Sequence, residues 1–360
     1  MKNNRVARES NIELLRVLSM MGVIVLHYNN PIFGGGLMYA VQGSVNFYIL
    51  YILETLFACA VNLFVLISGY FMCKSNKRNL IKPIQLIIQV MAFSLVIYLL
   101  RCVLGRTIFS FKSLALSLIP ANWFVILYIA LYIISPFINV ALSMLSKSNF
   151  KKLLLIIFIL FSIYPTLVDL AGELRSEQWY GLSSVGMYGS QWGYSIINFM
   201  LVYIIGAYIR INDIKVKKSN LWLILIMCIV LITGWSRLND VIGYFNEKTA
   251  WSYCNPLIIT EAIVLFLIFK NIKMKPSLII NSLAKASFTV FLLHNSFLGK
   301  LNVQKFAAAN PLLMILHLLI SCIGIYLICW LVHLLYDKIT NPVFELLKKS
   351  IGYINIGIAD

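Results

Sequence analysis

Apolar residues recur along the chain in blocks of about twenty, separated by short polar connections. A block of about twenty residues is what an α-helix needs to cross the hydrocarbon core of a bilayer. Ten blocks are present, and each predicts one membrane-spanning helix: residues 12–29, 48–72, 83–104, 122–142, 152–170, 194–210, 219–236, 252–270, 279–299 and 311–336. The alternating segments of an outer-membrane barrel are absent from the sequence. The pattern therefore predicts an all-α, polytopic integral membrane protein with a single transmembrane domain over residues 1–360.

Composition supports a membrane protein. Hydrophobic residues make up 61% of the chain and charged residues 12%, and a soluble domain has roughly twice that charged fraction. The seven cysteines are scattered and form neither a CxxC pair nor a Cys/His spacing, so no metal site is predicted. The net charge of +17 comes from short cationic clusters between apolar blocks, which is typical of cytoplasmic loops. No nucleic-acid partner is therefore expected.

The cations also predict an orientation. Of the 30 Lys and Arg residues, 21 lie on one set of alternate connections and eight on the other. Because cytoplasmic loops carry the excess of cations, both termini are predicted to be cytoplasmic. The first block follows Lys2, Arg5 and Arg8, and no small-residue cleavage site comes after it. It is therefore interpreted as a retained first span of a multi-pass protein of the cell membrane.

Arg16 and His27 stand near opposite ends of this first block. Eleven residues are close to three helical turns, so the two side chains share a face about 16 Å apart along the axis. Glu13 lies one turn before Arg16 and is predicted to pair with it. Ionisable groups in an apolar span are costly and by default indicate a functional site. Alternatively, Arg16 snorkels to the interface and His27 is a helix-end residue at headgroup level.

The spacing Arg16-x10-His27 resembles the motif of the membrane-bound acyltransferase type 3 family. Three further stretches fit that family in the right order: NLFVLISGYFM (62–72), the Trp-led NWFVILYIALYIISPFI (122–138) and SFTVFLLHNSF (287–297). With the ten spans, the resemblance covers nearly the whole chain. Two departures bear on the subfamily: Asn62, where many members carry an acidic residue, and Val65, which interrupts a Phe pair.

The resemblance implies transfer of an acyl group, usually acetyl, from cytosolic acyl-coenzyme A to a hydroxyl, usually of a surface glycan. The expected co-substrate is acetyl-CoA, and the expected partners are a glycan acceptor and the lipid bilayer. Four cations on the predicted cytosolic side suit the phosphates of coenzyme A: Arg16, Lys74, Lys77 and Arg78. For the lysines, positive-inside bias is the alternative explanation. A membrane transporter of a sugar-linked or small molecule, and an acyltransferase with a non-sugar acceptor, remain alternatives.

Histidines supply the candidates for acid–base chemistry. His27 suits a general base, because imidazole titrates near neutrality and can take the proton of an acceptor hydroxyl. His294 is the second candidate, because its span is predicted to run outward and to bring it to the depth of His27. A hydrogen-bonded core histidine is the alternative for His294. No motif surrounds His317 or His333, and both are interpreted as structural.

The remaining candidates line the predicted donor path or face the acceptor. Ser68, Gly69 and Tyr70, at the inner end of the second span, either permit close helix packing or line the donor path. Glu13 and Trp123 are expected to support that path.

On the predicted outer side, the connection 171–193 is rich in aromatic residues, among them Trp179 and Trp192. These rings could stack on a sugar acceptor or form an interfacial belt.

Overall fold

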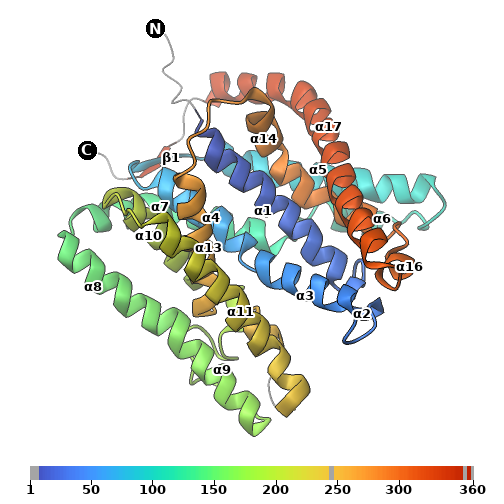
Figure 1. Ribbon diagram of the computed structural model, residues 1–360. Helices are drawn as coiled ribbons and strands as arrows, with labels where there is room; N and C mark the ends of the chain where they lie inside the picture. Colours follow the sequence, from blue (N-terminus) through green and yellow to red (C-terminus); the bar gives the residue numbers. More distant parts are fainter. Residues whose placement is uncertain (1–7, 243–246, 352–354, 358–360) are drawn as a thin grey trace. The chain divides into compact units, whose positions relative to one another are not determined.

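The computed structural model describes residues 8–242, 247–351 and 355–357. Helices dominate these residues, and β1 (Lys77–Asn79) and β2 (Asn355–Gly357) add one short antiparallel pair (Figure 1). The prediction of an all-α protein is thus confirmed. Lys2 and Arg5, which contribute to the charge count, lie outside the described residues.

The described helices group into two compact units. Unit 1 is built from the described residues of 1–71 and 146–333, and unit 2 from those of 72–145 and 334–360. Each unit combines segments that are distant in sequence. The single domain over residues 1–360 remains a prediction.

Within the described residues, seven helical segments are long and apolar enough to cross a membrane. Each coincides with a predicted span: Ser10–Asn29, Val45–Met72, Ile81–Val103, Trp123–Ser143, Lys147–Arg175, Lys218–Leu238 and Pro311–Lys348. The other three predicted spans are occupied by the shorter helices α10 (Ile196–Ile211), α13 (Pro256–Lys270) and α14 (Leu278–Leu293). These have 16, 15 and 16 residues, fewer than the ~20 of a typical span. The count of ten and the orientation of the termini therefore remain predictions.

Unit 1 contains most of the helices. They are α1 (Ser10–Asn29), α2 (Gly36–Tyr39), α3 (Val45–Phe57), α4 (Ala60–Met72), α8 (Lys147–Phe158), α9 (Tyr164–Arg175), α10, α11 (Lys218–Ile242), α12 (Glu247–Ala250), α13, α14, α15 (Asn295–Leu298), α16 (Val303–Ala307) and the first part of α17 (Pro311–Ile351). Helix α1 packs against α3, α13 and α14 (Figure 1). It ends at Asn29 because Asn30 precedes Pro31 and adopts an extended backbone, the conformation favoured before proline.

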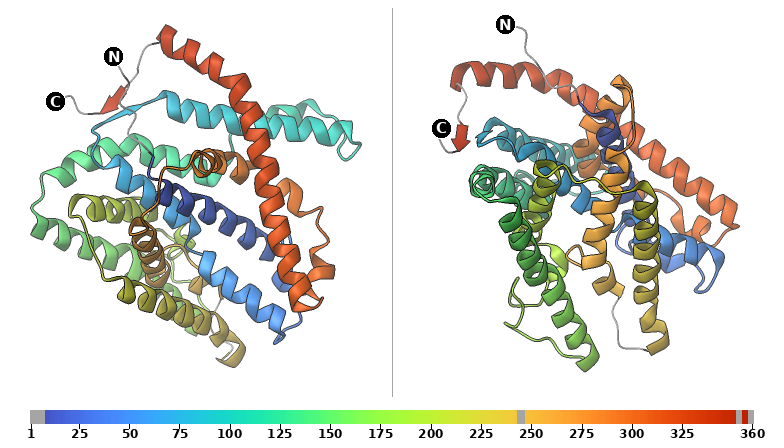
Figure 2. Two further views of the ribbon diagram at one scale, coloured as in Figure 1. Left: turned by 45° about the horizontal axis from the view of Figure 1, so that its top comes forward. Right: turned by 60° about the vertical axis from the view of Figure 1, so that its left-hand side comes forward.

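A π-helical turn joins α8 to α9. The turn covers Ile159–Ile163, so that the three elements follow one another as one long helix (Figure 2). Pro165 lies two residues after the end of this turn, in the first turn of α9. A proline ring inside a helix clashes with the carbonyl four residues before it. A wider π turn at this point relieves the clash and retains the length of the span.

Helices α4 and α10 approach closely at a pair of glycines. A Cβ atom on Gly69 would overlap the carbonyl oxygen of Tyr203, and one on Gly206 would overlap that of Leu66. The structure thus supports close packing as the role of Gly69. The hydroxyl of the neighbouring Ser68 donates to Phe64 O in its own helix, at 2.9 Å.

Gly69→Ala is expected to destabilise the protein by about 1–3 kcal/mol, the usual cost of overpacking, because the opposing atoms belong to a backbone. The melting temperature of the purified protein, with loss of the folded species monitored by size-exclusion chromatography after heating, measures the change. Gly234→Ala is the matched control, since a Cβ at Gly234 on α11 meets nothing within 4 Å. Equal melting temperatures for the two variants would contradict the packing role.

Unit 2 holds the remaining elements. They are α5 (Ile81–Val103), α6 (Phe111–Ser117), α7 (Trp123–Ser143), the β1–β2 pair and the last part of α17.

Candidate active site

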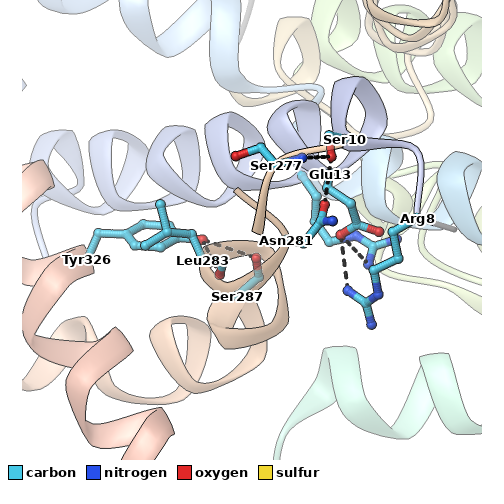
Figure 3. Close-up of polar contacts among 9 residues, drawn as sticks. Arg8, Ser10, Glu13, Ser277, Asn281, Leu283, Ser287 and Tyr326 are labelled. Atoms are coloured by element: carbon cyan, nitrogen blue, oxygen red, sulfur yellow. Dashed lines mark hydrogen bonds and ion pairs between the residues drawn. The ribbon is translucent and has the colours of Figure 1, made fainter. Parts of the chain in front are cut away.

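Helices α1 and α14 run parallel and side by side. At their N-terminal ends, Ser277 N donates to Ser10 Oγ at 2.8 Å, and Ser10 Oγ donates to Asn281 Oδ1 at 3.0 Å (Figure 3). At their C-terminal ends, His27 meets His294. Ser10 and Ser277 are 267 residues apart in sequence, as are His27 and His294, so one register holds along both helices. The prediction that His294 meets His27 is confirmed.

The two imidazoles are joined edge to edge by a short hydrogen bond. His27 Nδ1 and His294 Nε2 are 2.5 Å apart. The ring planes differ by 6° and the centroids are 4.7 Å apart, a distance that exceeds the nitrogen separation by about two ring radii. Parallel rings with one nitrogen pair this close lie nearly in a common plane. The contact is therefore an in-plane N–H···N bond and not ring stacking.

A backbone carbonyl determines which ring nitrogens of the two histidines carry a hydrogen. His294 Nδ1 lies 2.9 Å from Val290 O, and a carbonyl oxygen only accepts, so Nδ1 carries the hydrogen. Nε2 of a neutral His294 is then an acceptor, and the hydrogen between the rings belongs to His27 Nδ1. Nε2 of a neutral His27 is left with a lone pair. It is the basic nitrogen of the pair.

Three groups outside α1 surround His27 and restrict its position. The Phe33 ring lies 4.6 Å from the His27 ring, centroid to centroid. Gly34 N donates to His27 O at 3.1 Å, so the chain turns back over the end of α1. The side chain of Asn295 contacts His27 from the start of α15. Asn295 was not predicted as a site residue, although it directly follows His294 in the sequence.

At the other end of α1, one carboxylate holds two guanidinium groups. Glu13 is only 5% exposed, and its Oε2 is 3.4 Å from Arg8 Nη1 (Figure 3). The same Oε2 is 3.3 Å from Arg16 Nη1. The predicted pairing of Glu13 with Arg16 is confirmed. Two cations share one anion, so this end of α1 retains positive charge. The Arg16 side chain remains 26% exposed and can reach a further anion.

Further cations gather near the same end of unit 1. Asn11 Nδ2 donates to Phe269 O at 3.0 Å, which ties the start of α1 to the end of α13. Arg210, from the last turn of α10, donates to Tyr70 OH at 2.8 Å and is 4.0 Å from Glu9 Oε1. Tyr70 is therefore hydrogen-bonded to a cation, and its place on the donor path remains a prediction.

Lys270 completes this group of cations. It is 3.3 Å from Asp213 Oδ1, and hydrogen bonds from Lys215 and Lys270 lower the pKa of the Asp213 carboxyl. The sequence predicted Arg210 and Lys270 only as cytoplasmic cations and not as site residues.

A family model described as an acyltransferase domain matches residues 9–334. The chain belongs to the acyltransferase 3 family. The match begins just before α1 and ends within α17, so it includes Arg16, His27 and His294. No curated protein and no solved structure matches the chain.

Unit 2 of the acyltransferase holds the other predicted phosphate-binding cations. Arg78 is buried, and its guanidinium donates to Ser135 Oγ and to three carbonyls, those of Met72, Ser75 and Lys77, at 2.8–3.0 Å. These bonds hold the turn before α5, and a phosphate contact of Arg78 remains a prediction.

Two more predicted residues belong to unit 2. Lys74 is exposed and Lys77 lies in β1. Whether they bind the donor together with Arg16 remains a prediction. Trp123 begins α7, is partly exposed and packs edge-on against Phe124, so its supporting role also remains a prediction.

The two predicted acceptor-side tryptophans of the acyltransferase lie on separate turns of the segment 171–193. Trp179 is half-buried and donates to Glu177 Oε2 at 3.2 Å. Trp192 is 48% exposed and has a φ of +50°, which is uncommon for a residue with a side chain. Tyr253 N donates to Trp192 O at 3.0 Å and helps to hold that conformation. Strained residues cluster at functional sites, but sugar stacking by either tryptophan remains a prediction.

Proposed function

We propose that the protein is an O-acetyltransferase of the cell membrane that moves an acetyl group from cytosolic acetyl-CoA to a hydroxyl of a surface or membrane-linked glycan. His27 is the general base. Family membership supports acyl transfer over the transporter alternative. The observation that carries the assignment of the base is the hydrogen-bond chain from Val290 O through His294 to His27, because it leaves His27 Nε2 unprotonated.

In the proposed direct transfer, the acceptor hydroxyl oxygen attacks the carbonyl carbon of the thioester while its proton passes to His27 Nε2. The C–S bond of the tetrahedral intermediate then breaks, and the sulfur of coenzyme A takes the proton from Nε2. The products are the coenzyme A thiol and the O-acetylated acceptor. His294 accepts the Nδ1–H of His27 throughout, which keeps the imidazole in one tautomer and orientation. This is the role that an aspartate plays in a serine protease triad.

The donor is proposed to be held by its phosphates at the Arg16 end of α1. Arg16 and His27 are about 16 Å apart along the helix axis, so the extended pantetheine arm has to bridge that length. The positive charge left over at Arg8, Glu13 and Arg16 suits a polyanionic nucleotide, since guanidinium groups bind phosphate through paired hydrogen bonds. Acyl groups made in the cytosol would then reach an external acceptor without the whole cofactor crossing.

Arg16→Ala is expected to raise the concentration of acetyl-CoA needed for half-maximal activity about tenfold or more. A charge-assisted hydrogen bond contributes roughly 1.5–3 kcal/mol. Thioester cleavage by purified protein, measured over a range of acetyl-CoA concentrations, checks this, and excess donor should restore the rate. Arg175→Ala removes an exposed cation at the end of α9 as a control. An unchanged donor affinity in Arg16→Ala would exclude the phosphate role.

Two measurements test the proposed function itself. Purified protein in lipid nanodiscs should release coenzyme A thiol from acetyl-CoA, slowly when water takes the place of the acceptor hydroxyl and yields acetate, which a transporter would not do. Mass spectrometry of the surface glycans from a deletion strain should show the loss of O-acetyl groups that the restored gene returns. Thioester cleavage with an unchanged glycan would instead favour a non-sugar acceptor.

A further inference from the structure

Two cations near the Arg16 end of α1 lie close to one aromatic ring, and the mechanism above does not use them. Arg210 is in the last turn of α10, and its guanidinium carbon is 4.8 Å from the centroid of the Tyr70 ring. Lys270 is in the last turn of α13, and its Nζ is 5.8 Å from the same centroid. Each cation is attracted to the ring, but the two repel each other. A bound anion would relieve that repulsion.

Both side chains are accessible to such an anion. That of Arg210 is 35% exposed and that of Lys270 is 16% exposed. Arg210 Nη1 donates to the hydroxyl of Tyr70, which is itself only 3% exposed, so a fixed partner orients the guanidinium. A guanidinium has five N–H donors. Glu9 Oε1, at 4.0 Å from Nη1, is too distant for a hydrogen bond.

Positive charge exceeds negative charge in this group of side chains. Its five cations are Arg8, Arg16, Arg210, Lys215 and Lys270, and its three carboxylates are Glu9, Glu13 and Asp213. Asp213 is shared by Lys215 at 2.9 Å and Lys270 at 3.3 Å, so it does not neutralise both. Within the described residues, the group thus retains about the charge that a phosphate monoester would balance, since such a group carries nearly two negative charges at pH 7.

The cations are arranged along α1 in an order that matters for a long ligand. Glu9, beside Arg210, is the N-cap of α1, and Glu13 N donates to Glu9 O at 3.0 Å. Glu9 and Glu13 are therefore one helical turn apart, ~5.4 Å along the axis. From the catalytic end of the helix, the order is His27, then Arg16 beside Glu13, then Arg210 beside Glu9.

We infer that Arg210, with the added charge of Lys270, binds the 3′-phosphate on the ribose of acetyl-CoA, next to the diphosphate at Arg16. The inference rests on the proposed function. In acetyl-CoA the thioester is followed by the pantetheine arm, the diphosphate and then the ribose, which is the order of His27, Arg16 and Arg210. The 3′-phosphate is the monoester of the three phosphates and matches the excess charge. The site would therefore select coenzyme A thioesters over donors that carry phosphopantetheine alone.

Removing the 3′-phosphate from the ligand tests the inference directly. Isothermal titration calorimetry on purified protein gives the dissociation constants of coenzyme A and 3′-dephospho-coenzyme A. Nanodiscs of phosphatidylcholine are used, because headgroups without net charge do not compete for the cations. Loss of a charge-assisted contact should weaken binding of the dephospho form about tenfold or more. Equal dissociation constants in the wild type would overturn the inference and leave the proposed function standing.

Arg210→Gln should remove most of this difference between the two ligands. Coenzyme A should bind about tenfold more weakly, while 3′-dephospho-coenzyme A should bind as in the wild type. Glutamine can still donate to the Tyr70 hydroxyl, and Arg210→Lys, which keeps the charge, should retain part of the difference. Lys270→Gln is the second test in case Arg210→Gln does not fold. A structural role for Arg210 would weaken both ligands equally or neither, and either result would overturn the inference.

Lys152→Gln is the matched control. Lys152 is an exposed cation near the start of α8, also on the predicted cytoplasmic side, and its loss changes the net charge as Arg210→Gln does. The control should keep the wild-type ratio of the two dissociation constants. A ratio lowered as far as in Arg210→Gln would indicate a general effect of charge and overturn the inference. Wild-type protein that binds neither ligand and cleaves no acetyl-CoA would overturn the proposed function as well.

Discussion

His27→Gln should abolish most acyl transfer, lowering the rate by about 10²–10⁴-fold, the usual contribution of a general base. The glutamine amide can donate to His294 Nε2 in place of the imidazole Nδ1–H, so the 2.5 Å link between α1 and α14 has a substitute. A glutamine side chain cannot take a proton near neutral pH. The substitution therefore separates proton transfer from packing.

Protein level, monodispersity and coenzyme A binding should persist in His27→Gln, and only the rate of transfer should fall. His333→Gln is the control, because it removes another imidazole of unit 1, whose Nδ1 lies 3.0 Å from Thr289 Oγ1. Near-normal transfer by His27→Gln would mean that its imidazole is structural. The base would then have to be His294, although both of its ring nitrogens are hydrogen-bonded.

The encounter of the two histidines could be predicted because it follows from periodicity and span direction. The offset of eleven residues from Arg16 to His27 is close to three helical turns. The alternation of charged connections made the spans of α1 and α14 parallel. Two parallel helices that begin at the same depth bring residues of equal offset together, and the structure confirms this at both ends.

The proton arrangement could not be predicted, because it depends on a backbone carbonyl. Val290 O selects the tautomer of His294, and every helical residue carries such a carbonyl. Only the orientation of the ring decides whether the bond to it forms. The same limit applies to Arg78, whose guanidinium reaches the carbonyl of Met72 at 2.8 Å only because the chain turns there. A sequence shows the cation but not the local acceptors that engage it.

The division into two units was likewise not visible in the apolar blocks. The chain passes from unit 1 to unit 2 just before the polar connection between α4 and α5, and again within α17. Polar connections of the same kind separate most of the apolar blocks, so this one does not mark a boundary between units. Hydropathy reports which segments avoid water, and both units contain helices apolar enough to cross a membrane. Which helices share a unit depends on side-chain fit, such as the contact of Gly69 with the backbone of α10.

His294→Phe is expected to lower the turnover number by between about tenfold and 10⁴-fold while the half-saturating acetyl-CoA concentration stays unchanged. Phenylalanine has a ring of similar shape but no acceptor, so the Nδ1–H of His27 loses its partner. The imidazole can then adopt the other tautomer, which places a hydrogen on the nitrogen that must act as the base. In serine proteases, enforcing the wrong tautomer costs about 10⁴-fold in turnover. Single-turnover assays at saturating donor measure this loss separately from binding.

His294→Gln distinguishes positioning from packing. Its side-chain oxygen can accept the Nδ1–H of His27, so this variant should retain more activity than His294→Phe, even though phenylalanine fills the buried site better. A purely structural role predicts the reverse order, because His294 is fully buried and a polar side chain that fits badly there destabilises the fold. His333→Phe controls for the loss of a buried imidazole facing α14. Wild-type turnover in His294→Phe would show that the acceptor atom does not matter and that His27 is oriented by its helix and Phe33 alone.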